Sequence, residues 1–248
     1  KMYAEYIAAY STVMAQDFLR QLKPEDWVAL VSYDLRTHIE ADFTRNKEEV
    51  RRTLRNMVFP GFTEAVIYDA LYETLEQLKD VKGKKSILIL GSGQDTFSKK
   101  SLDDVLKRLR ETDVTIYTVV AGKAYLRYLE DHGYLGGKWG FVDRMNILQA
   151  ENQMRAFASM TGGRSWAPQF EGEWPNIFSD IAASLRNQYS LGYSPSNRVR
   201  DGKLRKIKVQ LVDANGAPLI VQDQKGKKVK YQIYAREGYL APKPGISD

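Results

Sequence analysis

The residues best suited to chemistry follow a short apolar run at 87–90, where a Gly-Ser-Gly triplet at 91–93 is followed closely by Asp95. A glycine-rich turn after a buried strand can cradle a phosphate group through its backbone N–H groups. A dinucleotide fingerprint needs a third glycine where this sequence has Thr96, and no Gly-Lys-Ser/Thr triplet follows. We therefore interpret the loop as a structural strand end rather than a nucleotide site.

The remaining reactive side chains do not form a catalytic pattern. The chain has no cysteine, which excludes thiol nucleophiles, disulfides and zinc-thiolate sites. His38 falls on the exposed face of a predicted strand and His132 falls in a predicted loop, without the converging partners that a triad or zinc site requires. The acidic pairs at 48–49 and 103–104 fall in first turns of predicted helices, where negative charge is favourable. The sequence does not favour an enzyme.

Charge and hydropathy set the class of protein. No apolar run approaches the roughly 18 residues of a membrane-spanning helix. The net charge of +6 is concentrated in 198–230, which holds ten Lys or Arg against three Asp. This stretch could bind nucleic acid or an anionic lipid surface. We favour the alternative that its lysines protect exposed sheet edges, because no nucleic-acid motif is present.

The elements that must position these residues are predicted from periodicity. Apolar residues at helical spacing predict a helix over 3–22, and a buried strand over 27–33 follows a Lys-Pro-Glu-Asp break. The alternation at 37–43 predicts a half-exposed strand near the sheet edge, antiparallel to its predecessor. Later elements are predicted in this order: helices at 46–57 and 67–78, a strand at 87–90, a helix at 101–109, a strand at 114–120, a helix at 147–160, a strand at 164–167 and a helix at 174–187.

This order predicts an α/β fold. Strand, helix and strand in succession favour a mostly parallel sheet sandwiched by helices. From residue 188 onward the period changes to two, at 189–193, 207–211 and 229–233, which predicts a small C-terminal antiparallel β appendage. We expect two units, residues 1–187 and residues 188–248.

Residues 122–145 combine glycines with large aromatic side chains and are expected to form an irregular insertion. Tyrosine and tryptophan are favoured as anchors in protein interfaces, so this stretch is a candidate partner-binding surface. The alternative, that the rings fold back as a local core, is equally open. The candidate partner-binding residues are Tyr125, Tyr128, Tyr134, Trp139 and Phe141.

Several segments together resemble the von Willebrand factor A family, and in particular the divergent branch described as VWFA-related proteins of Acidobacteria. No single segment is decisive, but their order and spacing match over nearly the whole chain. The segments are 22–31 (LKPEDWVALV), 61–63 (GFT), 68–71 (YDAL), 87–96 (ILILGSGQDT), 161–164 (TGGR), 188–193 (QYSLGY) and 236–239 (REGY).

The resemblance implies binding of a ligand or partner through a metal ion held by three loops at the carboxyl ends of the strands. The first loop, with an Asp-x-Ser-x-Ser motif, would precede Lys1 together with its strand. Thr63 matches the threonine of the second loop, whereas Ser92 stands where the third loop normally has an aspartate. A hard cation prefers charged oxygen ligands, so this change predicts weak or absent metal binding unless Asp95 substitutes. Mg²⁺ or Mn²⁺ is expected only if upstream residues supply ligands.

The leading functional expectation is a non-catalytic protein–protein interaction module with a degenerate metal site. The resemblance implies a scaffold or accessory subunit of an extracytoplasmic assembly, periplasmic or secreted, which could be large or associated with a membrane. The alternative is a metal-dependent adhesion domain that captures an acidic partner residue. An enzyme that uses the cleft at the strand ends is the least favoured reading.

Overall fold

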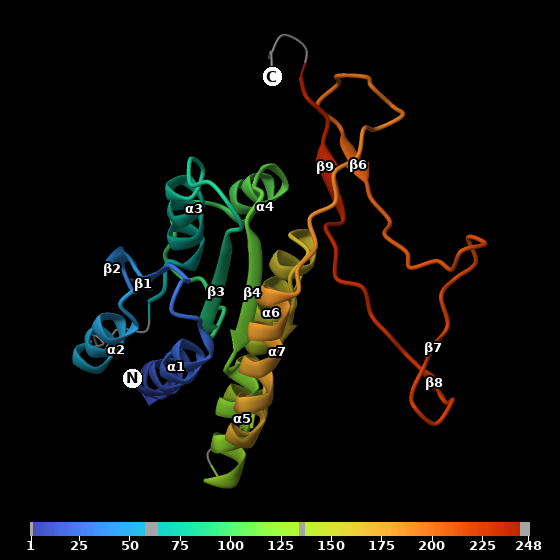
Figure 1. Ribbon diagram of the computed structural model, residues 1–248. Helices are drawn as coiled ribbons and strands as arrows, with labels where there is room; N and C mark the ends of the chain where they lie inside the picture. Colours follow the sequence, from blue (N-terminus) through green and yellow to red (C-terminus); the bar gives the residue numbers. More distant parts are fainter. Residues whose placement is uncertain (1, 58–63, 134–136, 244–248) are drawn as a thin grey trace.

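The computed structural model describes residues 2–57, 64–133 and 137–243, and it describes only the backbone of residues 2–4, 137–143 and 171. Helices and strands alternate along most of the chain (Figure 1). Their bounds are α1 Met2–Gln21, β1 Val28–Tyr33, β2 Thr37–Thr44, α2 Lys47–Asn56, α3 Ile67–Gln77, β3 Ser86–Gly91, α4 Leu102–Glu111, β4 Thr115–Val120, α5 Gly122–Asp131, α6 Gly137–Met160, β5 Ser165–Trp166, the 3-10 turn η1 Glu171–Glu173, α7 Trp174–Arg186, β6 Leu204–Lys206, β7 Val221–Gln222, β8 Lys228–Val229 and β9 Gly238–Leu240.

A parallel sheet of order β3-β4-β5 forms the centre of the fold. All six residues of β4 are buried, because helices cover both of its faces and a strand lies on each side. A parallel strand covered on both faces is apolar at consecutive positions rather than at alternate ones. The runs at 87–90 and 114–120 therefore predicted these strands correctly, and the expected α/β fold is confirmed.

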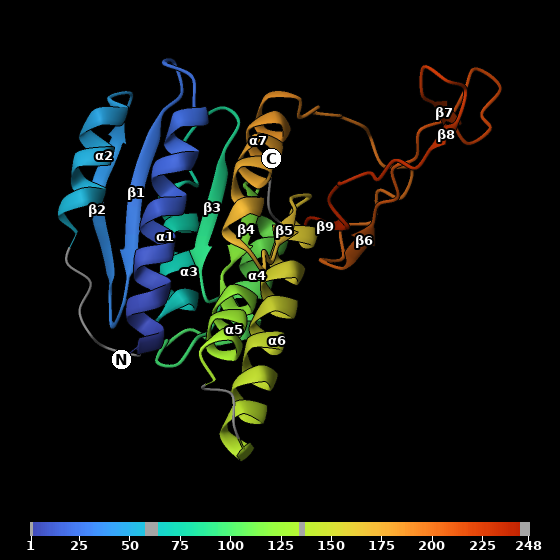
Figure 2. The ribbon, with the colours of Figure 1, turned by 90° about the horizontal axis from the view of Figure 1, so that it is seen from below.

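Two layers of helices sandwich this sheet (Figure 2). On one face, α3, α4 and α6 pack against Ile89 and Ile116, with Phe157 of α6 fully buried among them. On the other face, α1, α5 and α7 pack against Tyr117 and Val119. Successive residues of a strand point to opposite faces, so each strand contributes to both cores.

Strands β1 and β2 form a separate antiparallel hairpin. The hairpin packs on α1 and α2 through its own small core, which includes Leu19, Ala41 and Leu54. The predicted antiparallel pairing is confirmed, and β2 pairs with β1 alone among the described strands. Within the described residues β1 and β3 are not hydrogen-bonded neighbours, so the two sheets remain distinct.

Local signals in the sequence fix where two of the helices begin. The Asn46 side chain accepts a hydrogen bond from the N–H of Glu49 (3.2 Å) at the start of α2. Ser101 and Asp104 form a complete capping box at the start of α4, with the Asp104 carboxylate accepting from the Ser101 N–H (2.9 Å). Each cap satisfies donors that the first helical turn leaves without partners.

The expectation of an irregular insertion at 122–145 is wrong over most of its length. Helix α5 occupies 122–131, and α6 begins at Gly137, ten residues before the predicted start. Residues Tyr125 and Leu129 lie four apart on one face of α5 and are both buried against Ile147. Their helical spacing was the signal, but the neighbouring glycines masked it.

The C-terminal appendage contains less regular structure than the alternating pattern predicts. Strand β6 pairs with β9 and β7 pairs with β8, both antiparallel, so antiparallel strands are present. The strands expected at 189–193, 207–211 and 229–233 are wrong, except that β8 includes Val229. Tyr189 is 88% exposed and Leu191 is 77% exposed, because no described strand pairs with this stretch. Alternation of apolar and polar residues does not by itself provide a neighbouring strand to pair with.

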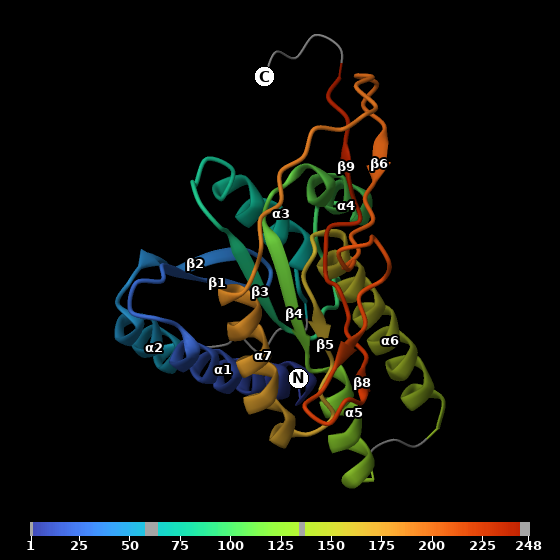
Figure 3. The same ribbon diagram turned by 45° about the vertical axis from the view of Figure 1, so that its right-hand side comes forward.

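The segment that leads into β9 nevertheless contacts α4. Figure 3 shows β9 running beside α4. The Arg236 guanidinium donates to the carbonyl oxygens of Leu109 (3.0 Å) and Thr112 at the carboxyl end of α4. Burial lowers the pKa of Arg236, while the nearby Asp113 acts in the opposite direction. This contact caps helix carbonyls that otherwise lack donors.

Candidate functional site

The carboxyl ends of β1, β3 and β4 lie at one edge of the fold, where parallel α/β sheets place their binding sites. The β3–α4 loop starts there and returns to the first turn of α3. Thr96 and Phe97 both donate backbone hydrogen bonds to the carbonyl oxygen of Ala65, at 2.9 and 3.3 Å. We call residues 92–100 the edge loop.

Two carboxylates brace the edge loop against α3. Asp95 accepts hydrogen bonds from the N–H of Tyr68 (3.1 Å), the N–H of Ser98 (3.4 Å) and the hydroxyl of Ser98 (2.5 Å). From the other side, Asp69 of α3 accepts from the N–H groups of Lys99 (3.0 Å) and Lys100 (2.7 Å). Hydrogen bonds to a carboxylate are stronger than those between two neutral groups. The bonds accepted by Asp95 and Asp69 therefore hold the edge loop in one position on α3.

Of the three candidate metal ligands, Ser92 and Asp95 lie within the described residues, and the side chains of both are engaged in hydrogen bonds. The Ser92 hydroxyl accepts from the N–H of Gln94 (3.1 Å) within its own turn. Thr63 lies outside the described residues. No group of three or more His, Asp or Glu side chains with the proximity needed for a cation occurs in the part of the chain that the structure describes.

Two tyrosines beside Asp95 remain protonated at neutral pH. Burial raises the pKa of Tyr33 to about 12, and the negative charge of Asp95 adds to the effect. Burial also raises the pKa of Tyr68; the hydrogen bond from Gln153 opposes this shift, and the Asp95 charge supports it. The described part of this edge thus carries neutral tyrosine hydroxyl groups and the carboxylates of Asp95 and Asp69, and the Ser98 hydroxyl donates to Asp95.

Among the described residues, this edge presents an exposed aromatic side chain that was not predicted from the sequence. Phe97 is 66% exposed although the edge loop that carries it is braced from both sides. A large apolar ring held in a fixed loop is suited to anchor a protein interface, since little conformational entropy is lost on binding. The available signal was one phenylalanine in an otherwise polar stretch, Gln94–Lys100.

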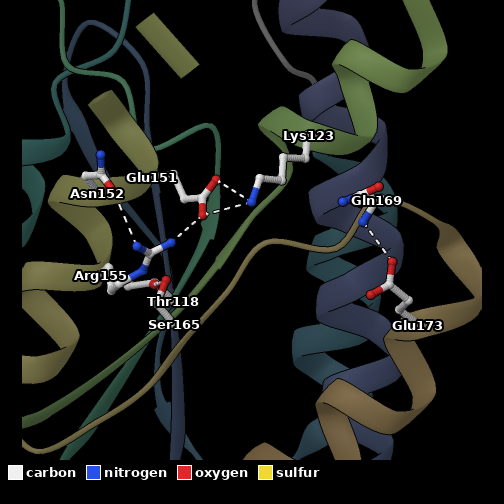
Figure 4. Close-up of polar contacts among 8 residues, drawn as sticks. All are labelled: Thr118, Lys123, Glu151, Asn152, Arg155, Ser165, Gln169 and Glu173. Atoms are coloured by element: carbon white, nitrogen blue, oxygen red, sulfur yellow. Dashed lines mark hydrogen bonds and ion pairs between the residues drawn. The ribbon is translucent and has the colours of Figure 1, made fainter. Parts of the chain in front are cut away.

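A buried ion cluster lies between α5 and α6 (Figure 4). Glu151 is 4% exposed, and its carboxylate lies 3.0 Å from the Lys123 ammonium and also binds the Arg155 guanidinium. Nearby, the Thr118 hydroxyl of β4 donates to the Ser165 hydroxyl of β5 (2.7 Å). Because the Glu151 carboxylate already has two cationic partners, we assign the cluster to holding α5 on α6.

The candidate aromatic surface is only partly available. Tyr125 is 7% exposed, so the expectation that its ring is presented to a partner is wrong. Tyr128 is half-buried, with its ring 5.2 Å from that of Tyr6. Tyr134 and the side chains of Trp139 and Phe141 lie outside the described residues.

Solved structures share this fold at low sequence identity. BatB from Bacteroides thetaiotaomicron, a conserved hypothetical protein, aligns with a TM-score of 0.53 at 9% identity, covering 73% of this chain and 89% of its own. A von Willebrand factor type A protein from Catenulispora acidiphila aligns with a TM-score of 0.51 at 10% identity, covering 94% of this chain and 51% of its own. Proximal thread matrix protein 1 from the mussel byssus, solved with a zinc-occupied MIDAS motif, aligns with a TM-score of 0.50 at 12% identity, covering 74% and 44%.

No curated protein matches the sequence. The structural similarities, all under 25% identity, show the fold alone. The sequence itself matches the von Willebrand factor type A domain over residues 9–134, which is just over half of the chain. Together with the parallel sheet between two layers of helices, this match shows that the chain belongs to the von Willebrand factor type A family.

Proposed function

We propose that this protein is a non-catalytic protein-binding module that uses the carboxyl edge of its sheet without a resident metal ion. Domains of this family are generally interaction or adhesion modules. The proposal that no metal ion is needed depends mainly on the hydrogen bonds that the Asp95 carboxylate already accepts. Its carboxylate braces the edge loop through three hydrogen bonds, and the Ser92 hydroxyl is engaged within its own turn.

The partner surface that this proposal favours is centred on Phe97. Its ring projects from the same braced loop, so a partner that packs on it meets a preformed surface. Half-buried Tyr128 stays a candidate for a second contact. We regard residues 188–248 as an appendage whose exposed apolar side chains, such as Tyr189 and Leu191, offer further contact area.

We infer a scaffold or accessory role in an extracytoplasmic assembly, in a branch like the Acidobacterial proteins that the sequence resembles. The similar fold of an aerotolerance-related membrane protein from Bacteroides fragilis is consistent with this inference, although at 10% identity it supports the fold only. No helix within the described residues is both long and apolar enough to cross a bilayer.

Cross-linking mass spectrometry on protein purified gently from its native source, with and without EDTA, tests the proposal. Cross-links from Lys99 and Lys100, which follow Phe97 by two and three residues, to one abundant partner should persist in EDTA. The Phe97→Ala variant should lose them, whereas Phe43→Ala, which removes a 45% exposed ring on β2, should keep them. Loss of the partner in EDTA would contradict a metal-independent interface.

The alternative function is metal-dependent adhesion, with Mg²⁺ or Mn²⁺ held partly by Asp95. Calorimetry with each ion separates the two functions. Micromolar affinity that disappears in Asp95→Ala but survives in Asp69→Ala would establish the alternative. The Asp69 variant is a matched control because its carboxylate also braces the edge loop, from the α3 side. Our proposal expects no measurable heat of binding in either variant or in the parent protein.

A further inference from the structure

The part of the appendage between β6 and β9 concentrates positive charge that the protein itself does not neutralise. Residues 206–231 contain six lysines and two aspartates, and we call them the basic hairpins. All six lysines are exposed, and their ammonium groups have no hydrogen bond or ion pair with any residue that the structure describes. The six are Lys206, Lys208, Lys225, Lys227, Lys228 and Lys230.

The two aspartates of the basic hairpins are used to build turns. The Asp213 carboxylate accepts hydrogen bonds from the N–H groups of the residues two and four positions later, both at 2.9 Å. Asp223 makes the same two bonds, again at 2.9 Å. A glycine at positive φ, Gly216 or Gly226, completes each turn. The aspartates therefore fix the hairpin tips and leave the lysine ammonium groups to solvent.

Large apolar side chains lie exposed between these lysines. Ile220 is 60% exposed and Val212 is 52% exposed. Single apolar side chains are common on protein surfaces, whereas a group of them within one short stretch indicates an interaction site. The exposed group in the basic hairpins consists of Leu211, Val212, Leu219, Ile220, Val229 and Tyr231.

The basic hairpins project from the rest of the molecule. Figure 1 and Figure 2, which are a quarter turn apart, both show β7 and β8 standing clear of the helices and of the parallel sheet. A flat surface can therefore reach the lysines and the apolar side chains together, without a clash with the main domain.

Protection of sheet edges, which the sequence favoured for these lysines, does not account for them. Strands β7 and β8 are two residues long each, so they have little edge to protect. Four of the six lysines lie outside the strands that the structure describes: Lys208, Lys225, Lys227 and Lys230.

The exposed side chains favour a lipid surface over other anionic partners. Single-stranded nucleic acid stacks its bases on aromatic rings, but five of the six exposed apolar side chains are aliphatic. A specific protein interface needs a closely packed core, which strands of two residues are poorly suited to form. A lipid surface is fluid and adapts to an irregular backbone. It takes up aliphatic side chains at the acyl boundary while lysines reach the headgroups.

We propose that the basic hairpins bind the surface of an anionic lipid bilayer. The lysine ammonium groups contact headgroup phosphates, and the aliphatic side chains around Ile220 enter the boundary between headgroups and acyl chains. This attachment is peripheral and needs no membrane-spanning helix. It goes beyond the protein-binding function and shares no residue with the edge loop, so either one can fail without the other.

Flotation of the full chain with lipid vesicles tests the charge. Vesicles of phosphatidylcholine and phosphatidylglycerol in about a 2:1 ratio should bind the protein, and pure phosphatidylcholine should not. Each lysine near the surface contributes about fivefold, equivalent to about 1 kcal/mol. Replacing Lys227, Lys228 and Lys230 by glutamine should therefore weaken binding about a hundredfold. The matched control replaces three equally exposed lysines of the main domain and should have little effect; these are Lys79, Lys82 and Lys107.

A second pair of variants tests the apolar contact. Changing Val212 and Ile220 to serine should weaken vesicle binding at least tenfold, because it removes side chains that leave water on binding. Ile39→Ser is the control, since this side chain on β2 is 55% exposed and lies outside the basic hairpins. Binding to a DNA duplex should not change in either variant.

Four results would overturn the proposal. The parent protein could bind both kinds of vesicle equally, or neither. The two lysine variants could lose the same affinity, which would assign the effect to net charge. DNA could bind more tightly than the anionic vesicles while the serine changes leave vesicle binding intact, which would assign a nucleic-acid surface. Finally, a rise from about 0.1 M to about 0.5 M salt could fail to release the parent protein, although screening should weaken these contacts. This last measurement needs no variant.

Discussion

Replacing Glu151 by glutamine should destabilise the fold far more than the same change at an exposed ion pair. The Glu151 side chain is 5% exposed and its carboxylate serves both Lys123 and Arg155. Removal of one member of a fully buried ion pair typically costs about 3–5 kcal/mol, because a charge is left without a partner. Here the side chains of Lys123 and Arg155 are 33% and 59% exposed and can regain water. Their partial exposure lowers the expected loss to about 2 kcal/mol, within the range for hydrogen bonds to charged groups.

The matched control is Glu130→Gln, which removes the same charge from the pair that Glu130 forms with Arg144. These side chains are 40% and 50% exposed, so the loss should stay below about 1 kcal/mol and shrink further at high salt. Urea unfolding of both variants measures the difference. With a slope of about 2 kcal/mol per molar urea, the Glu151 variant should unfold at a midpoint about 1 M lower than the parent. Equal midpoints for the two variants would refute the argument that burial strengthens this cluster.

Three further predictions use other features. Gly163→Ala should destabilise the protein by about 1–3 kcal/mol, because the added Cβ would lie 1.9 Å from the carbonyl oxygen of Ile116. Gly192→Ala is the control and should be nearly neutral, because no atom lies within 4 Å of a Cβ at that position. Thermal unfolding of both variants measures the difference. The pKa of Tyr33 is raised by burial to about 12, so its contribution to stability is complete below pH 10 and is lost as the pH rises from 10 to 12. Tyr33→Phe should therefore reduce the loss of stability over that range, and an unchanged alkaline unfolding profile would contradict this. Asp95→Asn should loosen the edge loop, giving faster amide exchange at Tyr68 and Ser98 without changing the response to Mg²⁺.

The sequence predicted the elements whose signal is local. The run at 87–90 and the capping box at Ser101 each specify a strand or helix through adjacent residues, and both are confirmed. The prediction of an irregular insertion at 122–145 was wrong because glycines beside aromatic residues suggested a loop. The burial of Tyr125 depends on a helix that is distant in the sequence. The extent of strand structure in residues 188–248 was overestimated for a related reason. A strand needs the edge of a second strand to pair with, and the alternation at 189–193 does not provide one.

The candidate site could be located but not described from sequence. The sequence correctly placed Ser92 and Asp95 after a central strand. Folds of this kind bind their ligands at the strand ends on this edge. The hydrogen-bond partners of the Ser92 and Asp95 side chains could not be predicted from the sequence. Whether Asp95 turns toward a cation or toward the start of α3 depends on the N–H groups of Tyr68 and Ser98, and one of these lies 27 residues away in the chain. Phe97 was missed because exposure is a property of the folded loop.

Two of the segments that carry the family resemblance, 161–164 and 236–239, share a structural role at the opposite end of the sheet. Gly162 and Gly163 leave room for the backbone of residues 235–236 and for the Ile116 carbonyl, respectively. The Thr161 hydroxyl accepts from the Ile116 N–H (3.0 Å), and Arg236 caps α4. Gly238 similarly permits β9 to approach Arg205 of β6. The two segments 161–164 and 236–239 thus close one joint between the domain and its appendage. Because the glycines act here through close backbone packing, the resemblance at these positions reports how the return strand is held rather than what the protein binds.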